Sequence, residues 1–457
     1  MRRLVFVGAH LGYPMDTTPL GGGAMVGLNL ARAWAARGGL AVTALGAGAL
    51  SPAAGVDYVR LGGAASAGAP DLVRFSEMEY ARFCRAFEGE TTRWLLDRAA
   101  RFPADSTAVV VNDISEAPDL DALARAGYRP VSLWHVDVAD YFCRMYLGGM
   151  VSTPAAVGIY ERLAALGAGK IVPDVLRLVF DKQRKTVRRS ARLIFPSRAM
   201  AEVVRRAYAG FFRSGAAFAE KARVVPWGSW DHPEKPDEAA TAAAVAALRA
   251  RYQITEQSLV LMTLSRLSPE KGVHLLLEAL ALSERRGDFA GKDVCLFICG
   301  APAFMRGEAY ARRVRRAARR LRQVRVFFPG YLGPDDKRAF FSLAKLFISP
   351  SVHESYGLNA MEAMRAGLPV LALEHYGSRD WPQEGFARAV SPEKSGGAAQ
   401  ALARGLREMI FDPRGLSSLG RAAAAFAAER PFSAAAQTVA DEAFSALDDA
   451  RPAPILK

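Results

Sequence analysis

Cysteine is scarce in this chain, at four of 457 residues. That number is too small for a framework of disulfide bonds. Cys295 and Cys299 lie in one apolar run, Val294–Cys299, and residues four apart on a strand share one face. A metal site would need close-set pairs and further ligands, and the neighbouring sequence offers none. We therefore predict that these two thiols pack in a core, and we exclude a disulfide scaffold.

Long apolar runs are also lacking, although 51% of the residues are hydrophobic. No segment reaches the roughly 20 uninterrupted apolar residues of a membrane-spanning helix. Met1–Arg3 and the run Leu4–Ala9 look superficially like a signal peptide, but the run is short. Gly12 and Pro14 follow it at once, so a first β-strand is the better interpretation. The absence of a targeting segment predicts a cytoplasmic location.

Acidic residues are fewer than basic ones, 46 against 60, which gives a formal net charge of +14. Such a charge attracts anions in general, so nucleic acid, anionic lipid and phosphorylated substrates all fit it. The densest basic run, Arg312–Arg325, predicts one helix with an apolar side around Val314 and Val324 and seven arginines opposite. This pattern is typical of a solvated face; the alternative is a surface for an anionic acceptor or the membrane periphery. Aromatic residues are not interleaved there, which argues against nucleic acid.

Short apolar runs alternate with longer amphipathic segments along the first half of the chain. A strand over 4–9, a helix over 24–37 and a strand over 40–45 begin the pattern. Further strands are predicted at 108–111, 130–134, 193–196 and 224–225. This β-α-β alternation indicates a parallel sheet covered by helices.

The same pattern restarts in the second half. Strands are predicted at 259–264, 294–299, 326–328, 346–348 and 369–373, and helices at 273–283 and 310–321. Residues 229–247 are rich in Pro, Asp, Glu and Ala, as a linker or an early helix would be. We expect an α/β fold with two doubly wound domains, at 1–228 and 229–430. The last segment, 431–457, predicts a final helix that packs back on the first domain.

A run of three glycines, Gly21-Gly22-Gly23, follows the first predicted strand and precedes a helix. Glycines let the backbone approach a ligand closely, and a helix start offers unpaired N–H groups to phosphate. The spacing matches neither a Walker motif nor a clean G-x-G-x-x-G. A phosphate-binding loop and a loop without a ligand both fit this run.

Two cations follow the first strand of the second domain, in the segment Ser265–Gly272. Ligands of open α/β sheets bind at the carboxyl ends of the strands, where Arg266 and Lys271 fall. Arginine offers a planar fork to phosphate oxygens, and lysine offers a mobile point charge. From its residues alone, this segment fits an anion site and a surface loop equally well.

The segment Ser349–Val370 combines a strand end, a loop and a helix. The helix is predicted to begin near Gly357 and to stop at Gly367. Glu354 then lies in the loop, and Glu362 lies about two turns into the helix. The N–H groups at the helix start would point toward a bound diphosphate, and the carboxylates would bind hydroxyls beside it.

This segment resembles the E-x7-E motif of retaining glycosyltransferases of family 4, with Glu354 and Glu362 at the required separation. Ser265-Arg266 with Glu270-Lys271-Gly272 looks like the second signature of that family. Arg223–Gly228 resembles its domain junction, with Trp227 in place of the usual Asn. The matches span most of the chain in the right order, which makes them far more specific together than singly.

The resemblance implies a GT-B fold, in which two Rossmann-like domains face each other across a cleft. It implies that the N-terminal domain binds the acceptor and that the C-terminal domain binds a nucleotide-sugar donor. The expected donor is a UDP-sugar, with a GDP-sugar as the next candidate, and no metal or other cofactor is expected. The expected acceptor is a hydroxyl of unknown identity, anionic or lipid-linked among the options.

The resemblance also implies roles for individual residues. Arg266 and Lys271 would neutralise the donor diphosphate, and Glu354 would lie near the hydroxyls of the transferred sugar. Glu362 would hold the ribose hydroxyls. Gly22 and Gly23 would approach the diphosphate from the other domain. Backbone N–H groups at the helix start would add donors, from Ser355, Tyr356, Gly357 and Leu358.

His135 ends a predicted strand of the first domain, at a place where the family often has a histidine near the reactive carbon of the sugar. A catalytic role follows from the resemblance, and a structural role is the alternative. Other GT-B enzymes, a phosphorylase or an epimerase, would share this architecture. A sugar-nucleotide-binding module without activity is the non-enzymatic alternative.

Overall fold

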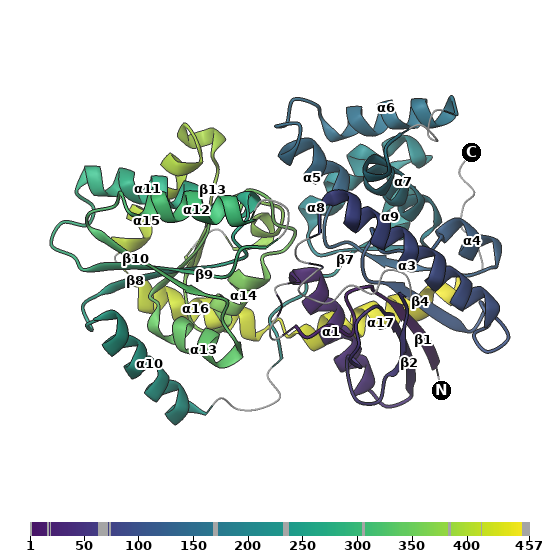
Figure 1. Cartoon of the computed structure of the whole chain (residues 1–457), viewed down its shortest axis with the longest axis horizontal. Helices are drawn as coiled ribbons and strands as arrows, with labels where there is room; N and C mark the ends of the chain where they lie inside the picture. Colours follow the sequence, from purple (N-terminus) through teal and green to yellow (C-terminus); the bar gives the residue numbers. More distant parts are fainter. Residues whose placement is uncertain are drawn as a thin grey trace. The chain divides into compact units, whose positions relative to one another are not determined.

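Parallel strands and helices alternate along the described chain in the computed structural model of this protein (Figure 1). The structure describes residues 2–15, 18, 20–62, 72, 75–167, 172–231, 237–303, 307–382, 385–412 and 414–449. The chain divides into two compact units: unit 1 holds residues 1–226 and 433–457, and unit 2 holds residues 227–432. Residues 232–236 of the predicted linker and 450–457 of the predicted last helix lie outside the described part.

Unit 1 is built on one parallel sheet of seven described strands, in the order β3-β2-β1-β4-β5-β6-β7. The strands are β1 (Arg2–Val7), β2 (Leu40–Gly46), β3 (Asp57–Arg60), β4 (Thr107–Val111), β5 (Val131–Leu133), β6 (Arg192–Phe195) and β7 (Ala222–Val224). The helices are α1 (Gly22–Ala35), α3 (Glu77–Asp97), α4 (Leu120–Arg125), α5 (Val138–Met145), α6 (Thr153–Ala165), α7 (Asp174–Arg189), α8 (Arg198–Ala207), α9 (Gly215–Lys221) and α17 (Phe432–Asp448), with a 3-10 turn η2 (Ala209–Phe211).

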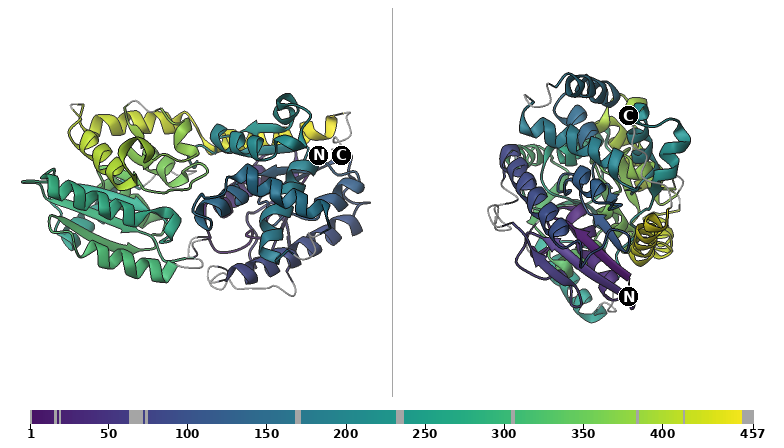
Figure 2. Two further views of the ribbon diagram at one scale, coloured as in Figure 1. Left: turned by 90° about the horizontal axis from the view of Figure 1, so that it is seen from above. Right: turned by 90° about the vertical axis from the view of Figure 1, so that its right-hand side faces the viewer.

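Unit 2 repeats this architecture with six described strands in the order β10-β9-β8-β11-β12-β13. The strands are β8 (Leu259–Leu264), β9 (Val294–Cys299), β10 (Val324–Gly330), β11 (Leu346–Ser349), β12 (Val370–Leu373) and β13 (Ala387–Val390). The helices are α10 (Glu238–Tyr252), α11 (Val273–Arg286), α12 (Gly307–Ala318), α13 (Pro334–Leu343), α14 (Leu358–Arg365), α15 (Ala398–Ile410) and α16 (Leu416–Ala428). Three 3-10 turns, η3 (Pro269–Lys271), η4 (Gly377–Asp380) and η5 (Glu393–Ser395), follow strand ends or precede helices. Helices cover both faces of this sheet, as Figures 1 and 2 show.

The central strands are buried along their whole length. Every residue of β4 is buried, and so is every residue of β9, which contains Cys295 and Cys299. Strands of a parallel sheet that is covered on both faces read as continuous apolar runs, which is why the sequence locates them well. The prediction that the two thiols pack in a core is confirmed.

The edge strands β3 and β13 are absent from the sequence-based prediction. β3 is only half-buried and has a charged residue at each end, Asp57 and Arg60. β13 reads Ala-Arg-Ala-Val and is half-buried at its two middle residues. These two edge strands are less covered by the rest of the unit than the central strands are. Their sequences can therefore contain polar residues, and they lack the apolar run that marks a central strand.

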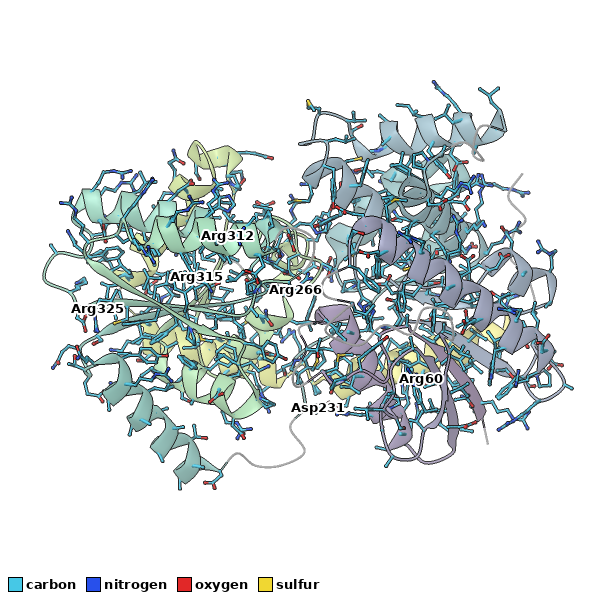
Figure 3. All side chains as sticks on the ribbon, viewed as in Figure 1. Arg60, Asp231, Arg266, Arg312, Arg315 and Arg325 are labelled. Atoms are coloured by element: carbon cyan, nitrogen blue, oxygen red, sulfur yellow. The ribbon has the colours of Figure 1, made fainter. Side chains whose placement is uncertain are left out.

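The helix predicted over 310–321 is present as α12, but the extension of its pattern over Arg312–Arg325 is wrong. α12 ends at Ala318, and Val324 and Arg325 already belong to strand β10. Val324 is buried because it enters the sheet, and its place on the helical wheel is a coincidence of spacing. Figure 3 shows Arg312 and Arg315 on the helix and Arg325 at the start of the strand.

The last helix, α17, packs within unit 1 beside α1 (Figure 1). The indole nitrogen of Trp34 donates a hydrogen bond of 2.8 Å to the carbonyl of Ala436. Glu442 accepts from Arg192 of β6 at 3.1 Å and from Arg223 of β7 at 2.9 Å. These contacts join the end of the described chain to the first sheet. No helix among the described residues is long and apolar enough to cross a membrane.

Candidate functional site

The strand order of unit 2 reverses between β8 and β11, which are hydrogen-bonded neighbours. Such a reversal leaves a crevice at the carboxyl ends of the two strands, because their following connections leave toward opposite sides. The segment with Arg266 and Lys271 follows β8, and the segment with Glu354 follows β11. The topology therefore brings the two segments singled out from the sequence to one edge of one sheet.

Lys271 and Glu354 form an ion pair at this edge, with 2.5 Å between Nζ and Oε2. Both side chains are largely buried, at 14% and 24% exposed. Burial raises the pKa of the Glu354 carboxyl, but the ammonium of Lys271 is the main cause that lowers it, and the pKa lies below its ordinary value. Glu354 is therefore ionised at neutral pH, and a positive charge lies beside it.

A glycine allows the two loops to meet. Gly272 has a φ of 63°, and a Cβ there would lie 2.0 Å from the carbonyl oxygen of Pro350. The N–H of Val352 donates to the carbonyl of Glu270 at 2.9 Å, which joins the loops directly. Any other residue at position 272 would separate Lys271 from Glu354.

Arg266 lies in the same segment but makes a looser contact. Its guanidinium is 3.7 Å from Glu270, whose carboxylate also accepts a hydrogen bond from Ser268. The arginine is about a quarter exposed. Figure 3 shows it at the opposite end of the sheet from Arg325, as expected for residues at the carboxyl and amino ends of parallel strands.

Helix α14 begins at this edge with unpaired N–H groups. Gly357 is its N-cap, with a φ of 93°, and no side chain caps the helix. A Cβ at Gly357 would lie 2.8 Å from the ring of Trp381, so only glycine fits here. Among the described residues, the N–H groups of residues 355–358 donate to no hydrogen bond. The predicted start near Gly357 and stop at Gly367 are confirmed.

The side chain of Tyr356 is buried within unit 2. Its hydroxyl oxygen accepts a hydrogen bond of 2.8 Å from the N–H of Gly228, and burial raises the pKa of this phenol to about 12. Tyr356 therefore anchors the helix start to the segment that opens unit 2. Only its main chain remains available at the site.

Glu362 is the fifth residue of α14, just over one turn from its start rather than about two. Its carboxylate lies 2.8 Å from Nζ of Lys337 and accepts a hydrogen bond from the indole of Trp230. Lys337 comes from α13, and Trp230 comes from the segment that opens unit 2. Neither residue was found from the sequence, because a lone lysine and a lone tryptophan carry no pattern.

His375 is a second residue that sequence reasoning missed. It follows β12 and is 4% exposed, and burial lowers its pKa to about 4. Nδ1 accepts a hydrogen bond from the N–H of Ser378, which places the proton on Nε2. Nε2 donates to no group of the described chain, and Cε1 of the ring would lie 3.5 Å from a Cβ at Gly357, at the helix start. The one feature of the sequence that could have pointed to His375 is its position shortly after a predicted strand.

In unit 1, the strand order reverses between β1 and β4, and His135, Asn112 and Gly23 meet beside that point. Nε2 of His135 lies 3.1 Å from Oδ1 of Asn112, whose amide nitrogen donates to the carbonyl of Gly23 at 3.1 Å. A Cβ at Gly23 would lie 2.9 Å from the imidazole ring. Two residues predicted from the sequence, Gly23 and His135, are thus brought together, and Asn112 is the link that was missed.

His135 is a neutral imidazole. It is 7% exposed, and burial lowers its pKa to about 4. Gly22 is the first residue of α1, and Gly21, with a φ of 106°, is its N-cap. The predicted site residues of unit 1 therefore lie on one strand end and one helix start.

A buried carboxylate also lies at this edge. Glu116 is fully buried, forms an ion pair with His10 and accepts from the N–H of Ala9 at 2.7 Å. Burial raises the pKa of Glu116, but His10 outweighs it and lowers the pKa overall. Burial and the nearby Glu116 raise the pKa of Asp113 to about 6. No group of three or more metal-ligating side chains occurs among the residues that the structure describes.

Residues 245–426 match the family model described as "Glycosyl transferases group 1". The chain is 31% identical over 202 residues to D-inositol 3-phosphate glycosyltransferase of Streptomyces avermitilis, which covers 43% of this chain and 42% of the relative. It is 33% identical over 143 residues to lipopolysaccharide 1,2-N-acetylglucosaminetransferase of Salmonella typhimurium, covering 30% and 36%. The chain thus spans less than half the length of these relatives.

Solved structures resemble the chain over nearly its whole length. Sucrose-phosphate synthase of Thermosynechococcus elongatus has a TM-score of 0.66 at 18% identity and covers 97% of this chain and 98% of its own. HepE of Anabaena in complex with UDP and glucose has a TM-score of 0.62 at 18% identity, covering 97% and 100%. The fold is therefore that of GT-B glycosyltransferases, with two Rossmann-like α/β domains, as predicted.

Proposed function

We propose that this protein is a retaining glycosyltransferase that moves a sugar from a nucleoside-diphosphate sugar to an acceptor hydroxyl. The observation that carries the proposal is the Lys271–Glu354 ion pair beside the start of α14. Both residues lie within the region that matches group 1 glycosyl transferases. The pair combines a cation for phosphate with an ionised carboxylate for sugar hydroxyls at one strand-order reversal.

Lys271, Arg266 and the start of α14 are the proposed diphosphate site. A lysine ammonium has three donors, so Lys271 can keep its bond to Glu354 and donate to a phosphate oxygen. The unpaired N–H groups of residues 355–358 and the helix dipole favour an anion at the same place. As the bond from the sugar carbon to the phosphate oxygen breaks, negative charge grows on that oxygen, and these donors stabilise it.

Glu354 and Glu362 are the proposed hydroxyl acceptors. Glu354 is ionised at neutral pH, so it accepts hydrogen bonds from hydroxyls of the transferred sugar. Glu362, held by Lys337 and Trp230, has the same role toward the ribose. Each carboxylate is paired with a lysine, which offsets the repulsion between a carboxylate and a nearby diphosphate.

The acceptor belongs to unit 1 in this proposal. His135 lies near the reactive carbon of the sugar and is uncharged there, and Gly22 and Gly23 approach the diphosphate. The acceptor oxygen bonds to the sugar carbon on the face that the phosphate leaves, and the hydroxyl proton passes to the departing phosphate oxygen. The mechanism needs no metal, because Lys271 and Arg266 supply the positive charge.

UDP is the first nucleotide to test, and GDP is the second. The Anabaena HepE structure contains UDP and glucose, and it shares the fold of this chain. The acceptor is an unidentified hydroxyl compound.

The proposal is tested by a thermal-shift screen of the purified protein with UDP, GDP, ADP and their common sugars. A ligand that binds the folded state raises the melting temperature by mass action. Release of nucleoside diphosphate from the best donor, with EDTA present, then measures transfer, and NMR of the product gives the anomeric configuration. Tight nucleotide binding without turnover on a broad acceptor panel would instead indicate a binding module. An inverted product would contradict retention.

A further inference from the structure

Exposed apolar side chains gather in one region of unit 1. Five of the twelve large apolar side chains that are exposed in the described chain lie between residues 146 and 166. They are Tyr146, Met150, Ile159, Leu163 and Leu166. Met150 and Leu166 are 87% and 82% exposed, so almost nothing of unit 1 covers them. Single exposed apolar residues are ordinary, but a cluster on one helix and its preceding loop indicates an interaction surface.

Helix α6 has two apolar faces, and only one of them belongs to the core. Val157 and Tyr160 point inward, and the ring of Tyr160 stacks on Phe180 of α7 at 5.1 Å. At 100° per residue, Ile159, Leu163 and Leu166 fall within an arc of about 60°, whose centre is about 150° from Val157 and about 90° from Tyr160. Figure 1 shows α6 at the outer edge of unit 1.

The outer face of α6 carries positive charge and no carboxylate of its own segment, although Glu77 of α3 accepts a hydrogen bond of 3.3 Å from the hydroxyl of Tyr146. Between residues 144 and 167 the single acidic residue is Glu161, which faces inward and pairs with Arg184 at 3.5 Å and Arg188 at 3.3 Å. Arg162 is exposed and falls about 40° beyond Leu166 on the helical wheel, at the edge of the apolar arc. We define the α6 surface as the side chains Tyr146, Met150, Ile159, Arg162, Leu163 and Leu166.

We propose that the α6 surface docks on a bilayer that contains anionic lipids. An amphipathic helix that lies in a membrane interface inserts large apolar side chains between lipids while its arginines reach the headgroups. The α6 surface has this composition, and the net charge of +14 adds long-range attraction to an anionic bilayer. This inference does not depend on the proposed donor site.

The exposed face of α12 lacks the apolar part of this pattern. Arg312, Arg313, Arg315 and Arg316 are exposed, but no large apolar side chain on that helix is. Such a face attracts an anionic surface without inserting into it. The membrane contact that was the alternative for the basic run of the sequence is therefore assigned to a different helix.

The first experiment is flotation of the whole protein with vesicles of phosphatidylcholine alone and of phosphatidylcholine with phosphatidylglycerol. We expect flotation with the anionic vesicles. The variant Ile159→Gln/Leu163→Gln/Leu166→Gln should bind them about tenfold more weakly or worse, because three inserted side chains are lost. The matched control is Leu50→Gln/Phe411→Gln, which changes two apolar side chains exposed outside the α6 surface and should bind like the wild type.

A single substitution keeps the test decisive if the triple variant unfolds. Leu166→Cys can be labelled with an environment-sensitive dye, because all four natural cysteines are buried. Its emission should shift to the blue on anionic vesicles, and that of labelled Leu50→Cys should not. Absence of flotation by the wild type, or flotation without a shift at position 166, would overturn the proposal. A third result would also overturn the proposal: the protein dimerises as its concentration rises, a label at Leu166→Cys prevents this dimerisation, and no vesicle binding is seen. That result would assign the α6 surface to contact with a second copy of the chain. The UDP thermal shift, measured on the same variants, reports the donor site separately.

Discussion

Both sheets of this protein contain a reversal of the strand order, but the side chains beside the two reversals differ in charge. Each strand order reverses once near its middle, between β1 and β4 in unit 1 and between β8 and β11 in unit 2. In unit 1 the reversal carries a neutral imidazole held by an amide, with Gly23 packed against the ring. In unit 2 it carries an ion pair of Lys271 and Glu354 beside an uncapped helix.

The two sites therefore differ in charge: Lys271 of unit 2 is a cation, whereas His135 of unit 1 is neutral and packs against Gly23. A buried imidazole with a pKa of about 4 cannot neutralise a phosphate at pH 7, so His135 adds no charge. A lysine that is held in place by a carboxylate can do so. In the proposed function unit 2 binds the anion and unit 1 adds no charge, so substitutions in the two units should fail in different ways.

The largest expected effect is that of Lys271→Met. Turnover should fall by roughly a hundredfold to a thousandfold, because a positive charge at the developing phosphate charge is lost. Steady-state release of nucleoside diphosphate from the best donor measures it. Lys337→Met is the matched control, since it also removes a lysine paired with a glutamate, and it should mainly weaken nucleotide binding.

The design must separate catalysis from folding. Removing Lys271 leaves Glu354 without its cation in a largely buried position, which is destabilising by itself. The double variant Lys271→Met/Glu354→Gln removes that charge and should regain the melting temperature but not the turnover. Wild-type turnover in a well-folded Lys271→Met protein would reject the assignment of this residue.

A second prediction concerns the shape of unit 1. Gly23→Ala should destabilise the protein by about 1–3 kcal/mol, because the new methyl group would lie 2.9 Å from the His135 ring. Gly89→Ala is the control: Gly89 lies within α3 with nothing within 4 Å of its would-be Cβ, and alanine there should be neutral or stabilising. Urea denaturation of both variants measures the difference. Equal stability of the two would mean that the imidazole moves aside freely.

The sequence predicted the two parallel sheets and the strand and helix bounds around Lys271 and Glu354 because these depend on local patterns. Buried parallel strands such as β8 and β9 are apolar throughout, and their predicted bounds agree with the structure. Gly357 and Gly367 mark the ends of α14 by their backbone conformations, which few other residues adopt. Position after a strand end singled out Lys271 and Glu354 separately, and their ion pair was not predicted.

What the sequence did not reveal depends on long-range contacts. Asn112 is 23 residues from His135, and Trp230 is 132 residues from Glu362. Nothing local to these residues indicates their partners. The basic run was misinterpreted for a related reason: 3.6-residue spacing continued by chance from α12 into β10, across a turn that contains neither glycine nor proline.

A third prediction compares two lysines. Lys221 of unit 1 is buried like Lys271, but it donates only to the carbonyls of Val187 and Arg188, at 3.0 and 3.1 Å. Burial lowers its pKa to about 8, from an ordinary value of 10.5. The folded state therefore binds this proton more weakly than the unfolded state, and its burial opposes folding at pH values below about 8. That opposition should be relieved as pH rises from 8 toward 10.5.

Lys221→Met isolates this contribution. The stability of the wild type relative to the variant should rise by about 1 kcal/mol for each pH unit above about 8, and it should be constant below pH 7. Urea denaturation at several pH values measures it. A difference that does not change with pH would show that Lys221 stays protonated in the folded protein.

The smallest expected effect separates two arginines of unit 2 that belong to the same basic run of the sequence. Arg325 donates to Asp293 at 2.9 Å and to the carbonyls of Tyr252 and Gln253 at 2.8 and 3.0 Å. Gln253, with a φ of 53°, is the C-cap of α10, so Arg325 pairs with the helix end where a cation is stabilising. Arg325→Ala should cost about 1 kcal/mol, whereas Arg312→Ala on α12 should stay within about 0.5 kcal/mol of the wild type. Equal decreases in the free energy of unfolding of the two variants, measured by urea denaturation, would contradict this prediction. Arg325 would then contribute no more to stability than a solvent-exposed arginine.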